Sequence, residues 1–256
     1  MKLGLDQHVA LITGGGSGIG AEAARLMASE GARVSLAGVP AAGVRRVAEA
    51  INRHGGQALA LPTDVAAPGA VRDAVRRTCD AFGRLDVAVA NAGVQLHRED
   101  RDLHTMNDDA WDRTQSVNYR GVYLTCKAAL AAMVEQGVGG SILITASISS
   151  LSGAPENPAY VASKHGVLGL MRHIAVHYAR FGIRCNAICP GALETTPNHD
   201  EHPDPDGRAG RRLHRIPLGR LGTDADIAPW VAWLASPLAG YATGGTFVVD
   251  GGFHAG

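Results

Sequence analysis

A tyrosine and a lysine four residues apart have the spacing in this chain that most directly suggests chemistry. Tyr160 and Lys164 lie in a stretch with a helical pattern, and residues four apart on a helix face the same side. A free tyrosine has a pKa near ~10, but an ammonium group beside it favours the phenolate. Lowering that pKa to about 7 needs roughly 4 kcal/mol of differential stabilisation. The pair could take up or release a proton, although alone it could equally be an ordinary surface pair.

A glycine-rich turn near the start of the chain could hold phosphate. It reads Thr13-Gly14-Gly15-Gly16-Ser17-Gly18-Ile19-Gly20 and lies between a predicted strand at 8–13 and a predicted helix at 18–30. Glycines let a backbone approach a ligand closely, and a helix N-terminus offers free N–H groups and a positive dipole end. The spacing differs from the usual G-x-G-x-x-G, but the strand-turn-helix context predicts a nucleotide site.

The end of the second predicted strand carries neither usual marker of cofactor choice. An acidic residue there typically binds the adenosine ribose of NAD, and Gly38 stands in its place. Ser17 and Val39 are not basic, so the marker for NADP is missing as well, and Arg45 and Arg46 come later. The choice between NAD and NADP stays open, and we favour NAD.

Strands and helices alternate along the chain in a way that would place these groups at one edge of a sheet. We expect strands at 8–13, 33–37, 57–61, 86–90, 141–145, 183–188 and 246–250, and helices at 18–30, 41–54, 68–82, 116–136, 158–181 and 224–235. This alternation predicts an α/β fold: a single-domain, Rossmann-type, doubly wound parallel sheet over residues 1–256, with helices on both faces. Residues 194–215, rich in Pro, Asp, His and Gly, are predicted to form a substrate lid.

Composition narrows the class of protein further. The formal net charge is zero, which gives no bulk attraction to nucleic acid or an anionic membrane. No stretch is long and apolar enough to span a bilayer and no signal sequence is evident, so we expect a cytoplasmic protein. The four cysteines form no C-x-x-C pair and are expected to be core thiols. His173 and His177 are four apart but lack the H-E-x-x-H pattern, so we expect no metal site.

Over essentially its whole length the chain resembles the short-chain dehydrogenase/reductase family. The resemblance rests on seven motifs in order, each weak alone: Thr13-Gly14-x-x-x-Gly18-x-Gly20; Asp64-Val65; Asn91-Ala92-Gly93; Asn118 within Val117-Asn118-Tyr119-x-Gly121; Ser147 thirteen residues before Tyr160-x-x-x-Lys164; Pro190-Gly191 with Thr195; and Ile216-Pro217-Leu218-Gly219-Arg220 with Asp250-Gly251-Gly252.

The resemblance implies an NAD(P)-dependent oxidoreductase acting on a secondary alcohol or its ketone. Ser147 would hydrogen-bond the substrate oxygen, Tyr160 would exchange the proton, Lys164 would hold the nicotinamide ribose, and Asn118 would keep a water in a proton relay. Asn91 would either tie strands together or contact the cofactor. The implied cofactor-binding residues are Gly14, Gly16, Ser17, Gly18, Ile19, Gly20, Gly38, Asp64, Val65, Asn91, Ala92, Gly93, Tyr160, Lys164, Pro190, Gly191, Leu193 and Thr195.

The family's layout also implies a substrate pocket and an assembly. The pocket would be lined by Gln95, His97, Ile148, Leu151, Ser152, Asn157 and Leu193. The partner would be a small-molecule alcohol or ketone, and the chain would form a homotetramer. Three alternatives stay open: an NADPH-dependent 3-oxoacyl thioester reductase, a nucleotide-binding protein without turnover, and a lyase or epimerase on the same fold. The second would show a broken catalytic set, and the third is typically longer.

Overall fold

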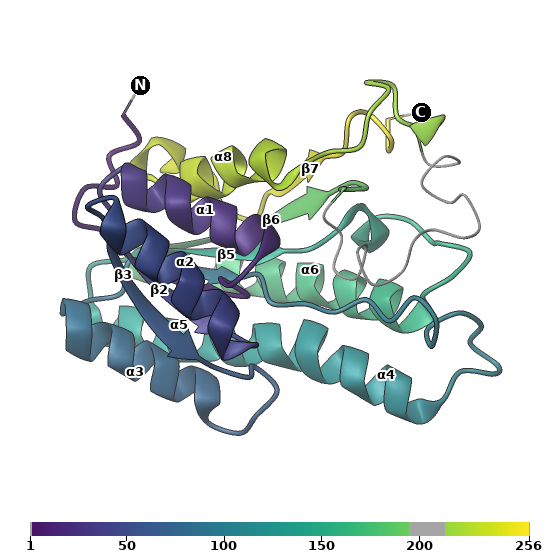
Figure 1. Ribbon diagram of the computed structural model, residues 1–256, viewed down its shortest axis with the longest axis horizontal. Helices are drawn as coiled ribbons and strands as arrows, with labels where there is room; N and C mark the ends of the chain where they lie inside the picture. Colours follow the sequence, from purple (N-terminus) through teal and green to yellow (C-terminus); the bar gives the residue numbers. More distant parts are fainter. Residues whose placement is uncertain (1, 195–212, 256) are drawn as a thin grey trace.

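Seven parallel strands form one sheet through the middle of the molecule (Figure 1). A computed structural model describes residues 2–194 and 213–255. The strands lie in the order β3-β2-β1-β4-β5-β6-β7. Their bounds are β1 Val9–Thr13, β2 Arg33–Gly38, β3 Gln57–Pro62, β4 Val87–Ala90, β5 Gly140–Thr145, β6 Ile183–Pro190 and β7 Thr246–Val249. The predicted fold class is confirmed.

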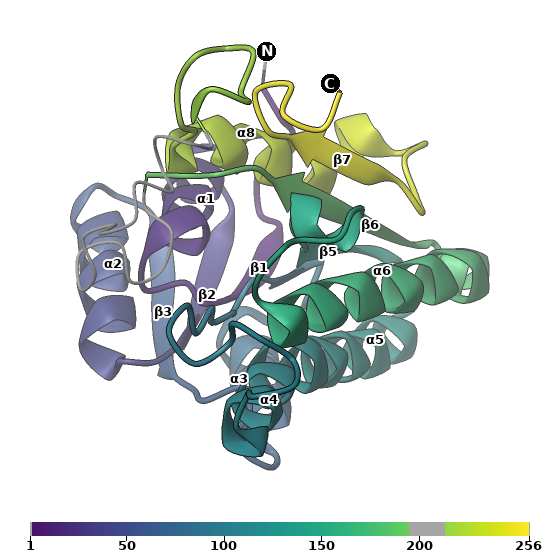
Figure 2. The same ribbon diagram turned by 90° about the vertical axis from the view of Figure 1, so that its right-hand side faces the viewer.

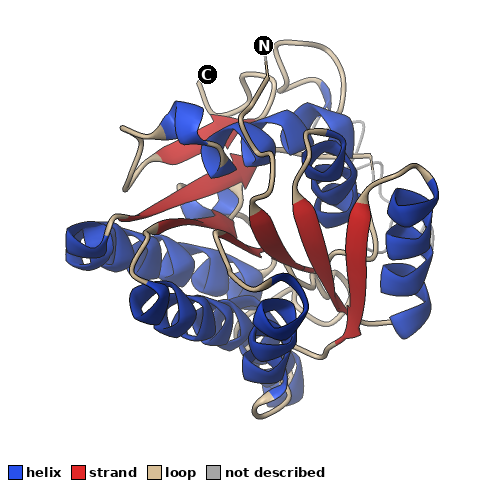
Figure 3. Cartoon of the chain, turned by 90° about the vertical axis from the view of Figure 1, so that its left-hand side faces the viewer, coloured by secondary structure: helices blue, strands red, loops and turns tan. Residues whose placement is uncertain are grey.

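Helices cover both faces of the sheet, as Figures 2 and 3 show. Apolar side chains of α1, α2 and α8 pack with one face, and those of α3, α5 and α6 pack with the other. The helices are α1 Gly18–Ser29, α2 Ala41–Arg53, α3 Ala70–Phe82, α4 Asp108–Gln115, α5 Val122–Gln136, α6 Pro158–Tyr178 and α8 Asp224–Ala235. The five inner strands β2, β1, β4, β5 and β6 are largely buried on both faces, so most of their residues are apolar without alternation, whereas the edge strands β3 and β7 are more exposed.

One helical region differs from the expectation. The helix predicted to begin at residue 116 begins at Asp108 instead, and it runs as α4, a π-helical turn η1 at Ser116–Gly121, and α5. The Asn107 side chain caps the start by accepting a hydrogen bond from the Asp109 N–H at 3.0 Å. An Asn followed by two acidic residues is a helix-start signal, so this boundary was readable from the sequence.

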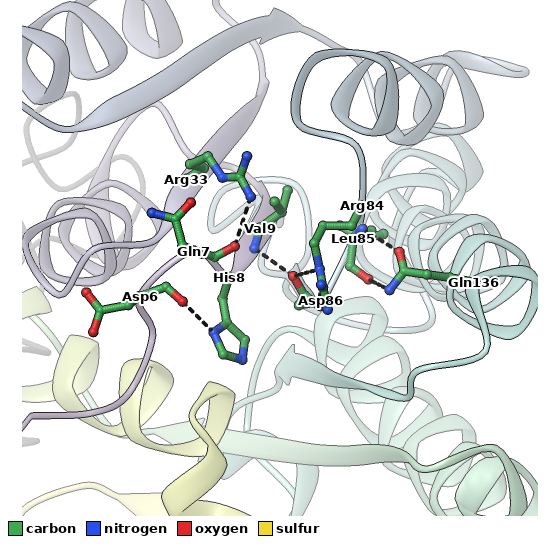
Figure 4. A network of polar contacts seen from close by, with 9 residues as sticks. All are labelled: Asp6, Gln7, His8, Val9, Arg33, Arg84, Leu85, Asp86 and Gln136. Atoms are coloured by element: carbon green, nitrogen blue, oxygen red, sulfur yellow. Dashed lines mark hydrogen bonds and ion pairs between the residues drawn. The ribbon is translucent and has the colours of Figure 1, made fainter.

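A polar network fastens the amino-terminal edge of the sheet (Figure 4). The Asp86 carboxylate accepts a hydrogen bond from the Val9 N–H at 2.9 Å and pairs with the Arg84 guanidinium at 2.6 Å. Gln136, at the end of α5, accepts a hydrogen bond from the Leu85 N–H at 2.9 Å. These contacts set β1, β4 and α5 relative to one another at the edge opposite the functional site.

The strand order reverses between β1 and β4. From β1 the chain winds outward to β2 and β3, and then returns to place β4 on the other side of β1. In doubly wound sheets, ligands bind outside the carboxyl ends of the strands at such a switch point. The glycine-rich turn follows β1 and Asn91 follows β4, so the predicted cofactor residues meet there.

Candidate active site

One long cavity lies over the carboxyl ends of the strands. Its volume is about 1390 Å³, more than a drug-sized ligand needs and suited to a dinucleotide together with a substrate. The glycine-rich turn and Gly38 line it, and so do Ser147, Tyr160 and Lys164. The predicted nucleotide cradle and the predicted catalytic pair therefore share one space.

The glycine-rich turn fits a pyrophosphate. Gly14 has φ +67°, and a Cβ there would lie 2.9 Å from the Asn91 amide nitrogen, so only glycine suits the position. Ser17 stands at the N-cap of α1, but its side chain makes no capping hydrogen bond. The first-turn N–H groups of α1 have no partners within the helix, and Gly18 and Ile19 line the cavity. The turn thus presents free donors and a positive dipole end to an anion.

The part of the cavity wall beside the end of β2, where the sequence places the adenosine, has no cationic side chain among the described residues. Gly38 and Val39 line it together with Thr63 and Asp64. Strand pairing places Gly38 beside β3, and the Gly38 carbonyl accepts a hydrogen bond from the Thr63 N–H at 3.1 Å. Among the described residues that line the whole cavity, the only Lys and Arg are Lys164 and Arg215. None of the described residues in that part of the wall is basic, so none of them would pair with a 2′-phosphate.

Lys164 is a buried cation held against a strand end. Its ammonium donates a hydrogen bond to the Thr145 carbonyl at 2.8 Å, and only 4% of the residue is exposed. Burial lowers the pKa of Lys164 to about 8, an effect that the nearby Cys189 partly opposes. The Lys164 nitrogen lies 5.5 Å from the centre of the Tyr160 ring. This distance confirms that the two side chains lie on the same side of the helix, as predicted. A charge so close to the ring favours the phenolate.

Ser147 is presented on a rigid turn between β5 and the short helix η2 (Ile148–Ser150). The Ser147 hydroxyl oxygen accepts a hydrogen bond from the Ser149 N–H at 3.1 Å, and the Ser150 hydroxyl accepts one from the Ser147 N–H at 3.2 Å. This reciprocal capping box fixes the backbone of Ser147. The Ser147 hydroxyl keeps its own proton to donate toward a substrate oxygen in the cavity.

The Asn118 side chain is committed to the backbone of Val94. Its amide nitrogen donates to the Val94 carbonyl at 2.8 Å, and its amide oxygen accepts from the Val94 N–H at 2.7 Å. Asn118 is fully buried within the π-helical turn η1, a feature often found at functional sites. The side chain therefore shapes the segment after β4, and the water-holding role stays a prediction.

Asn91 ties three strands together. Its amide nitrogen donates to the Thr13 carbonyl of β1 at 3.2 Å, and its amide oxygen accepts from the Thr145 hydroxyl of β5 at 3.0 Å. Asn91 itself follows β4 and also lines the cavity. The strand-tying role considered for it is confirmed.

Asp100 is the residue near the site that sequence reasoning missed. Its carboxylate is fully buried and accepts hydrogen bonds from the backbone N–H groups of Ala159 at 3.0 Å and Tyr160 at 2.9 Å. Nothing local predicts this contact, because Asp100 lies in the long loop after β4. The sequence even points away from it, because Asn157 just before Pro158 is a residue type that commonly caps a helix by itself.

Most of the predicted site residues come together. The predicted cofactor residues that line the cavity are Gly14, Ser17, Gly18, Ile19, Gly38, Asp64, Val65, Asn91, Ala92, Gly93, Tyr160, Lys164, Pro190, Gly191 and Leu193. Of the predicted substrate residues, Gln95, Ile148, Ser152, Asn157 and Leu193 line it.

Four predicted residues lie elsewhere. A Cβ on Gly16 would meet the Val44 nitrogen at 2.9 Å, and one on Gly20 would overlap the Gly14 carbonyl, so both glycines serve packing of the turn. Leu151 packs against the apolar cluster below the sheet. His97 does not line the cavity. Thr195 and most of the predicted lid, residues 195–212, lie outside the described part of the chain.

The part of the chain that the structure describes has neither a metal-binding cluster nor a helix that could span a membrane. Within residues 2–194 and 213–255, no group of three or more His, Cys, Asp or Glu side chains could hold a metal ion. The rings of His173 and His177 stack on each other, 5.5 Å apart. Over the same ranges, every helix is too short or too polar to cross a bilayer.

The fold and site define a nucleotide-dependent oxidoreductase, and comparison with known proteins specifies the family. Residues 14–254 match a family model described as enoyl-(acyl carrier protein) reductase. The chain is 39% identical to an L-rhamnose 1-dehydrogenase (NAD(P)(+)) of Sphingomonas sp. over 99% of this chain and 98% of that protein. It is 38% identical to a 2-(R)-hydroxypropyl-CoM dehydrogenase of Xanthobacter autotrophicus, covering 97% and 99%.

Solved structures agree. A short-chain type dehydrogenase/reductase from Mycobacterium marinum superposes with a TM-score of 0.91 at 34% identity, covering 100% of this chain and 98% of that one. Levodione reductase superposes with a TM-score of 0.90 at 36% identity, with 98% of each chain covered. The chain belongs to the short-chain dehydrogenase/reductase family. It is an NAD(P)-dependent oxidoreductase that interconverts a secondary alcohol and its ketone.

Proposed function

We propose that the enzyme oxidises a small, polar secondary alcohol, with Tyr160 as the general base and NAD as the preferred cofactor. The observation that carries this proposal is the arrangement of Ser147, Tyr160 and buried Lys164 on the wall of the cavity that also holds the phosphate cradle. Because all three residues line one space, an alcohol bound beside Ser147 and Tyr160 would also lie near the buried Lys164 ammonium.

The residues of the chain would divide the work as follows. The Ser147 hydroxyl hydrogen-bonds the substrate oxygen and orients it toward Tyr160. The Tyr160 phenolate takes the hydroxyl proton of the alcohol, and in the reverse direction the phenol returns it to the ketone. The Lys164 ammonium favours the phenolate. The bound nicotinamide supplies hydride acceptance or donation, and the fixed backbone around Ser147 and Tyr160 supplies alignment.

The preference for NAD is supported by charge at the adenosine end. A 2′-phosphate near Gly38 and Val39 would meet no cation from the described wall, while the Asp64 carboxylate lies close by. The relatives named L-rhamnose 1-dehydrogenase carry NAD(P) in their names, so both cofactors are worth testing.

Polarity of the substrate end favours an alcohol over an acyl thioester. Near Tyr160 the wall includes the polar side chains of Gln95, Ser149, Ser152 and Asn157. A long acyl chain covering such groups would leave them without hydrogen bonds, which costs free energy. The 3-oxoacyl thioester reductase is the second candidate, because the matching family model is described by an activity on another acyl thioester.

Assembly and location belong to the same proposal. We infer a cytoplasmic homotetramer built on one domain, as the family resemblance implies. Two exposed apolar areas support the assembly: Tyr123 and Val176 on α5 and α6, and Trp230 and Val248 on α8 and β7. Sedimentation that gives a monomer would contradict it.

The decisive test replaces Tyr160 with phenylalanine. We expect Tyr160→Phe to lower alcohol oxidation by at least about a thousandfold while NADH binding, followed by nicotinamide fluorescence, changes less than a few-fold. Tyr123→Phe, which changes an exposed tyrosine of α5, is the control. If Tyr160→Phe retained activity, the acid/base would be another group.

A further inference from the structure

Helix α6 begins at an asparagine that does not cap it. Asn157 occupies the N-cap position, where an asparagine in extended backbone normally accepts a hydrogen bond from an N–H of the first turn. Here Asn157 has φ 67° and ψ 52°, a left-handed conformation, and its side chain makes no capping bond. A residue type suited to capping is therefore present in a conformation that prevents it from capping.

A distant carboxylate does the capping instead. Asp100 accepts from the N–H groups of Ala159 at 3.0 Å and Tyr160 at 2.9 Å, and the Asp100 carbonyl accepts from the Asn157 N–H at 3.0 Å. Pro158 has no N–H to satisfy. The first turn of α6 is thus complete without the Asn157 side chain, which leaves that amide available for another partner.

The Asn157 amide lies in the cavity wall with a polar atom unsatisfied. Asn157 is 6% exposed and lines the cavity, and its amide oxygen is buried without a hydrogen-bond partner. The other such atoms in the described chain belong to Arg33, Ser35 and Thr114, which do not line the cavity. The Asn157 amide nitrogen is not one of these shielded atoms, so it is the end of the amide that a substrate beside Tyr160 could contact, and a turn of the amide on binding would present the oxygen instead.

We propose that the Asn157 amide binds a second hydroxyl group of the substrate, within one or two carbons of the carbon that is oxidised, so that the substrate is a polyhydroxylated compound such as a diol, polyol or sugar. This inference rests on the proposed function of the site. Asn157 and Tyr160 are both clamped to Asp100 by their backbone N–H groups, which keeps the two side chains within one small region of the wall.

The charges and the amide chemistry select a hydroxyl. A half-turn about χ2 exchanges the amide oxygen and nitrogen in nearly the same volume, so the amide can offer either an acceptor or a donor. A hydroxyl both donates and accepts, and it satisfies either orientation. The Glu156 carboxylate next in the chain is paired with Arg101 at 3.2 Å, so it offers no free charge to a charged group, and an ammonium group would also approach buried Lys164.

The experiment compares matched alcohols on matched variants. Cyclohexanol, 1,2-cyclohexanediol and 1,3-cyclohexanediol carry the same ring and reacting carbinol, with and without a second hydroxyl. Asn157→Gly removes the amide and suits the left-handed backbone, so the fold should hold. Asn107→Gly is the control, because Asn107 caps α4 with its side chain and does not line the cavity. NADH binding and thermal unfolding of each variant check its folding.

We expect the unmodified enzyme to favour a diol over cyclohexanol by at least about tenfold in kcat/KM. Asn157→Gly should bring that ratio close to one, and Asn107→Gly should leave the ratio unchanged. Equal use of cyclohexanol by the unmodified enzyme, or a ratio that survives in Asn157→Gly, would overturn the inference. An enzyme that binds NADH but oxidises neither these alcohols nor simple acyclic secondary alcohols would contradict the proposed function instead.

Discussion

The Asp100 carboxylate accepts a hydrogen bond from the backbone N–H of Tyr160 at 2.9 Å, across 60 residues of chain. It accepts a second from Ala159 at 3.0 Å. The loop after β4 is thereby joined to the first turn of α6, which carries Tyr160, the proposed acid/base. The backbone position of Tyr160 is thus fixed by a buried carboxyl group that does not line the cavity.

Replacing Asp100 should affect both stability and turnover. Asp100→Asn keeps one acceptor but places amide hydrogens against a backbone N–H, so we expect unfolding to become easier by about 1–3 kcal/mol. We also expect kcat to fall at least about tenfold, because a small displacement of Tyr160 misaligns the proton transfer. Denaturant unfolding and steady-state kinetics measure the two effects.

A charge-matched control separates position from charge. Asp102→Asn alters an exposed residue of the same loop and should change neither quantity appreciably. NADH affinity should stay within a few-fold in both variants. A normal kcat in a destabilised Asp100→Asn enzyme would show that Asp100 supports the fold without positioning Tyr160.

Lys164 should make the stability of the enzyme depend on pH. Burial lowers its pKa to about 8 in the folded chain, against about 10.5 for a free lysine. Below pH 8 the folded state bears the full cost of a buried ammonium. Between these two pH values the unfolded chain holds a proton that the folded chain has lost, so the contribution of Lys164 to stability rises with pH.

The measurement compares the native enzyme with Lys164→Met. Relative to this variant, the free energy of unfolding of the native enzyme should rise by about 3 kcal/mol between pH 7 and pH 10.5. The variant should also lose alcohol oxidation near neutral pH. A constant difference across that range would mean that the ammonium is well solvated or paired.

Gly38 offers a simple way to sharpen the choice of cofactor. A Cβ there would make only ordinary contacts, 3.5 Å from Val44 and 3.6 Å from Gly14, and its φ lies outside the left-handed region. Gly38→Asp should therefore fold and add a carboxylate for the ribose hydroxyls. We expect NADPH affinity to fall about tenfold or more, with NADH binding equal or tighter.

Adding a positive charge at the neighbouring position tests the same part of the cavity wall. Val39→Arg places a cation on an exposed residue that lines the cavity and should tighten NADPH relative to NADH. Fluorescence titration with each cofactor measures both variants. An unchanged NADPH affinity in Gly38→Asp would place the adenosine ribose away from Gly38.

Asn91 should matter for stability through the strands that it joins. Asn91→Ala removes the bonds to Thr13 and Thr145 and leaves a strand carbonyl and a hydroxyl of two buried residues without this partner. We expect a loss of about 2 kcal/mol in denaturant unfolding. Asn52→Ala, which breaks two exposed hydrogen bonds to Ala58, should cost less. Equal losses would remove the special role of Asn91.

Local patterns were enough for most of the architecture. The strand at 57–61 and the helix at 41–54 are found nearly as expected, because apolar spacing and flanking glycines act over a few residues. The helix expected at 68 begins at Ala70 instead, because Gly69 adopts φ 77° just before it. The start of α4 carried a readable signal at Asn107 that the prediction did not use.

By itself, the sequence determined the family, the parallel sheet, the phosphate turn and the pair Tyr160 and Lys164, because each is written in neighbouring residues or in ordered motifs. Only the tertiary structure decided that Asp100 caps α6, that the Asn118 side chain bonds to the backbone of Val94, and that the Asn157 amide oxygen has no hydrogen-bond partner. Such contacts join residues far apart in the chain, so they exist only once the strand order has brought the loop after β4 and the start of α6 to the same edge of the sheet.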